Sequence, residues 1–236
     1  MPVILDVTNA GQIERAAQHI ADATGAAGLD GLVNNAGIGQ SAPVELATPE
    51  SLRQIFDVNL FGQLAVIRAF LPALRVARGR IVNVGSVGAK MAIPFGGALC
   101  ASKAAFEIFS DSLRLELRPQ GIHVSVIQPG AIRTPAVDKT LGNADQTIAT
   151  WPEAMRSRYG PAFRSFTERA AARENHGSDP EIVARAIHHA LTSTRPSIRY
   201  RAGRDSTLLA TLPRLLPDRV LDALRLRLLG QPTKFG

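Results

Sequence analysis

Two side chains in the middle of this chain could act together on a substrate. Ser86 follows an apolar run, and Lys103 lies further along the sequence. A hydroxyl and an ammonium group can both donate hydrogen bonds to an oxygen atom, and both can take part in proton transfer. Leu99 lies between them and has neither an ionisable proton nor a hydrogen-bonding group. Any proton transfer near Leu99 therefore has to use another group.

Several groups could supply that proton or react as nucleophiles. The two tyrosines are Tyr159, in a predicted lid, and Tyr200, in a predicted strand where a structural role is favoured. Water bound between Ser86 and Lys103 is the favoured substitute acid. Cys100 has no histidine placed in the sequence to activate it, so we interpret it as a small buried residue.

Hydrolase and metal chemistry are disfavoured. The segment Gly85-Ser86-Val87-Gly88 lacks the Gly-x-Ser-x-Gly spacing of a hydrolase nucleophile elbow. His188 and His189 have no second ligand group at metal-binding spacing. We expect these histidines to pack at the surface and in the core, and we expect no metal site.

The elements that must position these groups alternate between β-type and helical runs. The β-type runs are nearly continuous Val, Ile and Leu, which is typical of strands buried on both faces of a parallel sheet. The sequence therefore predicts an α/β, doubly wound, Rossmann-like fold. We expect strands at Val3–Val7, Gly31–Asn34, Arg80–Val84, His123–Gln128 and Ser197–Arg201, and helices at about Ala10–Thr24, Pro49–Val76, Ala98–Arg118 and Asp179–Thr192.

The carboxyl-terminal third is less regular. The segment at about 136–177, with helical pieces around 152–173, resembles a lid or binding loop. The tail at about 207–236 is rich in Leu and Arg, and Pro213 and Pro217 are expected to break it into short helices.

Composition and charge narrow the class of protein. The chain has 236 residues, of which 45% are hydrophobic, and no linker divides it, so we expect one domain over 1–236. It has one cysteine, no signal-peptide pattern and no uninterrupted apolar run of about 18 residues, so we expect no disulfide, no membrane-spanning helix and a cytoplasmic location. The net charge of +7 could attract nucleic acid or anionic lipid, but RNA-binding signatures and zinc spacings are lacking, so no nucleic-acid partner is expected.

Taken in order, the motifs resemble the short-chain dehydrogenase/reductase family of the classical type. The resemblance runs from Pro2 to about Gly203, and the motifs that carry it are Asn34-Asn35-Ala36-Gly37, Asn59, Ser86, Lys103 and Pro129-Gly130. It implies hydride transfer between a nicotinamide cofactor and an alcohol or ketone. It also implies that Ser86 bonds the substrate oxygen, that Lys103 binds the nicotinamide ribose and that Asn59 holds a water. In the family a tyrosine exchanges the proton, and Leu99 stands at its position here.

The resemblance implies that the cofactor is NADP or NAD. The residues that it assigns to the cofactor are Asp6, Asn35, Ala36, Gly37, Lys103, Pro129, Gly130, Ile132 and Thr134, while Asn34 is expected to brace the sheet. The family's glycine-rich turn, which receives the pyrophosphate at a helix N-terminus, is lacking from this sequence. This chain is therefore expected to bind either cofactor weakly or not at all.

By the same resemblance, Val3–Val7 corresponds to the third strand, and the first two strands are lacking. In the strand order 3-2-1-4 this leaves Val3–Val7 two places from its nearest neighbour. Either it slides beside Gly31–Asn34 as a right-handed crossover, or it is frayed and the sheet edge is exposed. A third interpretation is that the sequence is N-terminally truncated and that the physiological protein carries about 50 more residues before Met1, as the resemblance implies.

Three functions remain open at this stage. The first is an oxidoreductase for lipid-, steroid- or retinoid-like alcohols and ketones, suggested by the similarity of Val87-Gly88-Ala89-Lys90 to steroid and retinol dehydrogenases. The second is a noncatalytic scaffold or regulatory subunit of a homodimer or homotetramer, a possible pseudoenzyme, built on the helices Pro49–Val76 and Ala98–Arg118. The third is attachment to a membrane surface through the Leu/Arg tail, although packing of these leucines on the core or a partner is favoured.

Overall fold

A four-stranded parallel sheet forms the centre of the molecule. The computed structural model describes residues 2–232. Its strands are β1 (Gly31–Asn34), β2 (Arg80–Val84), β3 (His123–Pro129) and β4 (Arg199–Ala202). They pair in the order β1-β2-β3-β4, with Ile81 opposite Val124 and Ile127 opposite Tyr200. The predicted α/β fold with a parallel sheet is confirmed.

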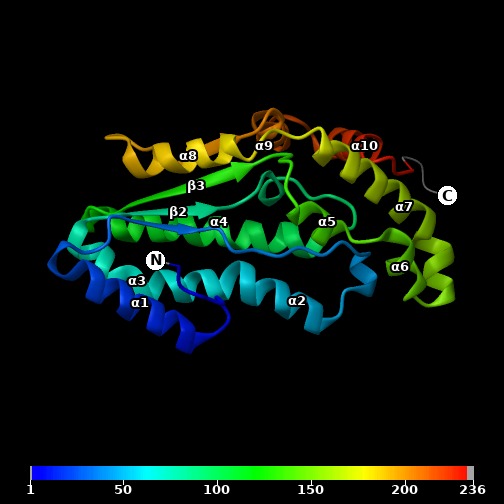
Figure 1. Cartoon of the computed structure of the whole chain (residues 1–236). Helices are drawn as coiled ribbons and strands as arrows, with labels where there is room; N and C mark the ends of the chain where they lie inside the picture. The colour runs from blue at the N-terminus through cyan, green and yellow to red at the C-terminus, as the bar shows by residue number, and fades with distance from the viewer. Residues whose placement is uncertain (1, 233–236) are drawn as a thin grey trace.

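Helices cover both faces of this sheet (Figure 1). On one face lie α3 (Gln63–Ala77) and α4 (Gly97–Leu117), with α1 (Ala10–Thr24) packed on α3, and on the other lie α8 (Glu181–Thr192) and α9 (Ser206–Leu215). The face covered by α3 and α4 holds the larger apolar core, which includes Ile67, Phe70, Leu74, Ile81 and Phe106. Burial on both sides explains why the central strands are rich in β-branched residues.

The helix predicted to begin at Pro49 is one long, continuous helix. It comprises α2 (Pro49–Phe56), a π-helical turn (Asp57–Gly62) and α3, and it begins where the Thr48 hydroxyl accepts a hydrogen bond from the Ser51 amide at 3.1 Å. Its best 18-residue window has a mean hydropathy of 1.5, which by length and composition alone is enough to span a membrane. The expectation of no membrane-spanning helix rested on uninterrupted apolar runs, whereas this window contains a few polar residues and still has a high mean hydropathy. Its apolar residues form much of the core beneath the sheet, which accounts for the composition.

The predicted strand at Val3–Val7 is wrong. Residues 2–6 have no regular structure, and Ile4 is 91% exposed. Within residues 2–232, β1 is an edge strand that pairs with β2 alone. A strand needs a neighbour for its backbone N–H and C=O groups, and Val3–Val7 has none here. Of the two arrangements expected for this segment, the exposed sheet edge is the one observed.

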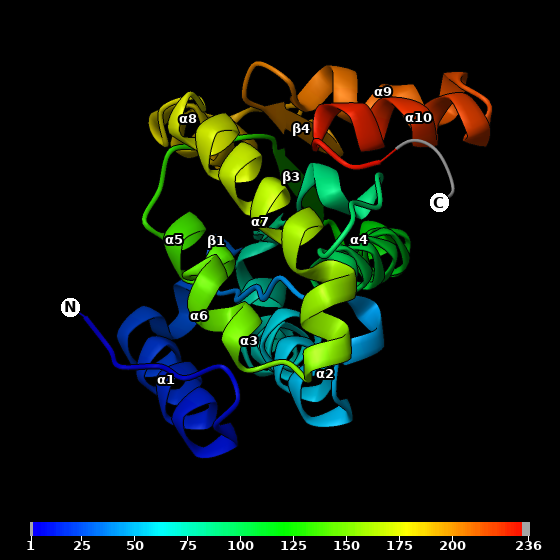
Figure 2. The same ribbon diagram turned by 90° about the vertical axis from the view of Figure 1, so that its right-hand side faces the viewer.

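The remaining helices gather beyond the carboxyl ends of the strands. They are α5 (Ala136–Leu141), α6 (Ala144–Ala149), α7 (Glu153–Asn175) and α10 (Asp218–Leu228). Viewed toward those strand ends, α7 crosses in front of the sheet while α9 and α10 lie to one side (Figure 2). The segment predicted as a lid is thus mostly helical.

The predicted helix break at Pro213 is wrong, whereas Pro217 does separate two helices. α9 continues through Pro213 to Leu215, because a proline near the end of a helix removes only one backbone hydrogen bond. Leu216, which precedes Pro217, has the extended backbone that proline imposes on its neighbour, and α10 begins after it.

Candidate active site

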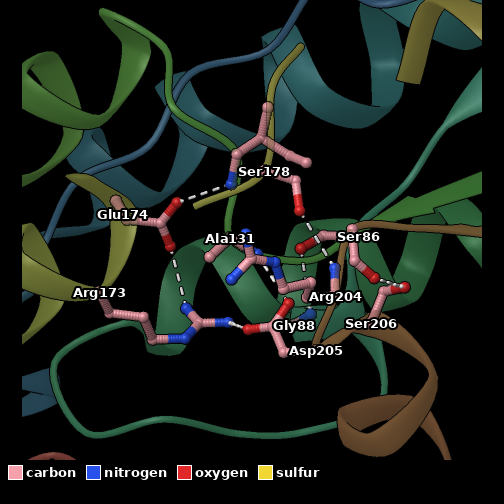
Figure 3. Close-up of polar contacts among 11 residues, drawn as sticks. Ser86, Gly88, Ala131, Arg173, Glu174, Ser178, Arg204, Asp205 and Ser206 are labelled. Atoms are coloured by element: carbon pink, nitrogen blue, oxygen red, sulfur yellow. Dashed lines mark hydrogen bonds and ion pairs between the residues drawn. The ribbon is translucent and has the colours of Figure 1, made fainter. Parts of the chain in front are cut away.

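Ser86 and Lys103 come together at the carboxyl end of β2. Ser86 directly precedes a short helical turn, and its Oγ accepts a hydrogen bond from the Gly88 amide at 3.0 Å (Figure 3). This leaves the hydroxyl hydrogen free to be donated. Lys103 lies on α4, and its Nζ donates to the Val84 carbonyl at 2.8 Å. Burial lowers the pKa of Lys103 to about 8, while the charge of Glu107 opposes this shift.

Asn59 is held close to Lys103 by a π-helical turn. Such a turn inserts one extra residue into a helix and often occurs at functional sites. The Asn59 side chain is completely buried; it accepts from the Ile38 amide at 2.8 Å and donates to the Ile38 carbonyl and the Ser102 hydroxyl, each at 2.9 Å. A Cβ on Gly37 would lie 3.3 Å from Asn59 Oδ1 and 3.4 Å from Lys103 Nζ, so glycine allows this loop to approach both groups.

Leu99 occupies the place where a tyrosine is expected. It lines a cavity of about 150 Å³ together with Ser86, Cys100 and Lys103. It also lines a neighbouring cavity of about 500 Å³, bounded by α7, α9 and α10. Most side chains around this larger cavity are apolar, for example Phe166, Leu209 and Leu229. The spacing from Ser86 to Lys103 thus does bring these side chains together, around a leucine.

A cluster of three charged residues, Arg173, Glu174 and Asp205, lies beside the two cavities: all three line the larger one, and Arg173 and Glu174 also line the small one. The Asp205 carboxylate accepts from the Ala131 amide and the Glu174 carboxylate from the Ile132 amide, each at 3.1 Å. Arg173 lies between the two carboxylates, 2.9 Å from Glu174 and in contact with Asp205 (Figure 3). Burial raises the pKa of Glu174, while the Arg173 charge and the Ile132 amide oppose the shift. No motif in the sequence predicted this cluster.

The loop that follows β3 holds four predicted cofactor residues. Pro129 and Gly130 lie at the end of the strand, and Ile132 and Thr134 follow; all four line the larger cavity. The Ile132 amide already donates to Glu174. A cofactor contact at that amide therefore requires the Glu174 carboxylate to move.

The residues predicted for the adenosine end are dispersed. Asn35–Gly37 form the loop after β1, beside Lys103. Asp6 lies in an exposed turn, where hydrogen bonds from the Thr8 amide and hydroxyl lower the pKa of its carboxyl group. The strand that was expected to carry Asp6 is lacking. Asn34 donates to the Asn83 side chain at 2.9 Å inside the sheet, which agrees with the bracing role expected of it.

Other reactive side chains are engaged elsewhere. The Tyr159 hydroxyl donates to Glu45 at 2.6 Å, and that bond raises the pKa of the phenol. The Tyr200 hydroxyl lies 2.9 Å from His189 Nδ1 on the neighbouring helix, which fits a structural role. Cys100 is buried, and burial raises the pKa of its thiol. Among the side chains that the structure describes, no three of His, Cys, Asp or Glu are grouped so as to hold a metal ion.

Comparison with known families places this geometry in context. The family described as short chain dehydrogenase matches residues 1–144. Among curated relatives, mouse (Mus musculus) retinol dehydrogenase 5 is 38% identical over 98% of this chain and 74% of its own length. Rat (Rattus norvegicus) 17-beta-hydroxysteroid dehydrogenase type 6 is 41% identical over 94% of this chain and 71% of its own length.

Solved structures agree with these relatives. A short-chain dehydrogenase from Streptomyces avermitilis is 30% identical, with a TM-score of 0.70 over 96% of this chain and 76% of that chain. A short chain dehydrogenase from Burkholderia cenocepacia J2315, solved in complex with NADP, is 29% identical, with a TM-score of 0.69 over 97% of this chain and 80% of that chain.

Proposed function

Because the chain belongs to the short-chain dehydrogenase family, we propose that it transfers hydride between a nicotinamide cofactor and an apolar alcohol or ketone. The observation that carries this proposal is the shared cavity of Ser86, Leu99 and Lys103, which lies beside a larger apolar cavity. A substrate held in the larger cavity can present its oxygen to the smaller one. The names of the relatives, which refer to retinol and a 17β-hydroxysteroid, favour a lipid- or steroid-like substrate.

NADP or NAD is proposed as the cofactor, and the Lys103 end of the site fits it. The Lys103 ammonium donates one hydrogen bond, to Val84, so its other hydrogens can bind ribose hydroxyls. The loops Asn35–Gly37 and Pro129–Thr134 flank that position and would hold the rest of the nicotinamide nucleoside. When bound, the cofactor supplies or accepts the hydride. At the loop after β3 the fit requires that Glu174 release the Ile132 amide.

Ser86 and Lys103 have distinct tasks in this proposal. Ser86 donates its hydroxyl hydrogen to the substrate oxygen, because its own oxygen already accepts from Gly88. Lys103, with a pKa of about 8, is a stronger acid than an exposed lysine. It can therefore pass a proton, through a bound water and Ser86, to an oxygen that gains negative charge.

Leu99 limits the rate of this chemistry. General acid–base catalysis contributes roughly 10²–10⁴-fold, or about 3–5 kcal/mol of the barrier. The isobutyl group of Leu99 can fill space in the cavity but cannot hold a proton. We therefore propose that this chain turns over slowly.

A noncatalytic scaffold is the second candidate, and exposed apolar side chains favour it. Phe61 on the long helix is 58% exposed, and Ile108 and Leu115 on α4 are 63% and 59% exposed. These helices pack against each other, so the residues offer an apolar surface for a second copy of the chain. A homodimer or homotetramer is proposed on this basis. Analytical ultracentrifugation of Ile108→Arg tests it, with dissociation as the expected result.

Titration of the purified chain with NADPH and NADH separates the two candidates. The oxidoreductase predicts saturable binding of one cofactor, followed by the fluorescence of its nicotinamide, and weaker binding to Lys103→Met. Arg185→Met, an exposed change on α8, is the matched control and should bind as the wild type does. Lack of binding of both cofactors at millimolar concentration would exclude the oxidoreductase and favour the scaffold.

A further inference from the structure

The larger cavity carries positive charge that its own residues do not neutralise. Three arginines line it: Arg169 and Arg173 on α7, and Arg225 on α10. The two acidic residues on its wall, Glu174 and Asp205, both pair with Arg173. Arg169 and Arg225 therefore have no acidic partner among the lining residues that the structure describes.

Arg225 is the more buried of these two arginines. Its side chain is 17% exposed and pairs at 3.0 Å with Asp222, whose own side chain is 63% exposed. The Arg225 Nε is buried and has no hydrogen-bond acceptor. Burial raises the pKa of the Cys100 thiol, and the Arg225 charge opposes that rise, so the guanidinium acts on the end of α4 that also bears Leu99. A buried donor without an acceptor is unfavourable, and an anionic ligand near it would relieve that cost.

Arg169, on α7, adds a second positive charge to the cavity wall. It is exposed, and among the side chains that the structure describes no carboxylate forms an ion pair with it. Residues of both α7 and α10 contribute to the cavity wall. A carboxylate between them can accept hydrogen bonds from two guanidinium groups, which hold planar anions in fixed geometry.

The rest of the cavity suits an apolar body. Phe166, Leu209 and Leu229 contribute to its wall, and its volume of about 500 Å³ lies in the range of cavities that enclose small organic ligands. We propose that this cavity binds long-chain apolar carboxylates, with the acid group against Arg225 and Arg169 and the chain directed toward Leu99. This inference deepens the proposed function, on which it rests for the role of the cavity: the substrate has its alcohol or ketone near Leu99 and a carboxylate at the other end of its apolar chain.

Competition among three ligands of equal chain length tests the proposal on the wild-type protein. Displacement of N-phenyl-1-naphthylamine, a neutral fluorescent probe, is measured without cofactor for dodecanoate, dodecan-1-ol and dodecyltrimethylammonium. The two ionic ligands are kept below their critical micelle concentrations and the alcohol below its solubility limit. We expect dodecanoate to bind at least about 10-fold more tightly than the alcohol, as charge-assisted hydrogen bonds require, and the cation to bind most weakly. Equal affinity for the acid and the alcohol would overturn the proposal.

Variants locate the anion site. Arg225→Gln and Arg169→Gln should each reduce the preference for dodecanoate, and Arg225→Glu should shift it toward dodecyltrimethylammonium. The controls are Arg227→Gln on α10 and Arg156→Gln on α7; both residues are exposed and neither lines the cavity. An unchanged preference in Arg225→Gln and Arg169→Gln would assign the binding to another place and overturn the proposal.

These measurements need no turnover, so they fail independently of the proposed function. Acid binding without any cofactor binding would keep the anionic site and exclude the oxidoreductase. Cofactor binding with equal affinity for acid and alcohol would keep the oxidoreductase and exclude the anionic site.

Discussion

The two sides of the site are held by different kinds of contact. On the β2–α4 side, Asn59 and Glu107 are completely buried and hydrogen-bonded. On the α7–α9 side, the Arg173 side chain is 40% exposed where it bridges Glu174 and Asp205. Loss of a buried polar partner is costly, whereas exposed ion pairs contribute little and are screened by salt. The comparison indicates a β2–α4 side formed in advance and an α7–α9 side that a ligand can rearrange.

The strongest way to break the β2–α4 side is Glu107→Ala. This carboxylate lies 3.0 Å from the Lys90 ammonium and accepts from Gln128 at 2.8 Å. Its removal leaves a partly buried cation without a partner, and we expect the free energy of unfolding to fall by about 3–5 kcal/mol. Urea unfolding of this variant, beside the exposed control Glu116→Ala on the same helix, measures the loss. Equal losses in both variants would contradict the comparison.

The second-largest expected effect is a pH dependence of the free energy of unfolding, which Lys103 causes. Its pKa is about 8 in the folded chain and 10.5 in the unfolded one, so between these pH values the unfolded state holds more protons. The free energy of unfolding should therefore gain up to about 3 kcal/mol from this group as pH rises from 8 to 10.5. In Lys103→Met this contribution is lost. If urea unfolding gave the wild type and Lys103→Met the same dependence of unfolding free energy on pH, the lowered pKa of a buried Lys103 would be refuted.

The smallest expected change in the free energy of unfolding comes from breaking the contacts on the α7–α9 side. Arg173→Gln removes partly exposed ion pairs, and we expect it to lower the free energy of unfolding by at most about 1 kcal/mol. In 1 M NaCl, where screening acts over about 3 Å, the difference from the wild type should vanish. A loss of several kcal/mol that persists in high salt would mean that this side is as rigid as the other.

The same two sides differ in how far the sequence predicts them. Ser86 follows a strand and Lys103 lies on a helix, and the apolar patterns of these two elements define their bounds within a residue or so. The parallel sheet brings the end of the strand and the helix together. Glu174 and Asp205 act on the loop after β3 from 42 and 74 residues further along the chain. Local sequence patterns do not reveal contacts between residues so far apart in the chain. The position of Asp205, just after the last strand, was the only available signal, since polar groups at strand ends face the site in this fold.

The segment Val3–Val7 shows that backbone structure, too, depends on neighbours that the local sequence does not reveal. Its residues are as apolar as those of β2, yet β2 has neighbours on both sides and Val3–Val7 has none. Hydrophobicity predicts that a segment can be a strand, whereas pairing decides that it is one.

Hydride transfer by Leu99→Tyr tests the central claim most directly. With saturating cofactor and a retinol- or steroid-like alcohol, cofactor absorbance should report turnover that is about 10²–10⁴-fold faster than in the wild type, because the rest of the site is in place. Leu99→Phe, which adds the ring without the hydroxyl, should give no gain. A tyrosine variant no faster than the phenylalanine variant would contradict the claim and leave the scaffold as the function of this chain.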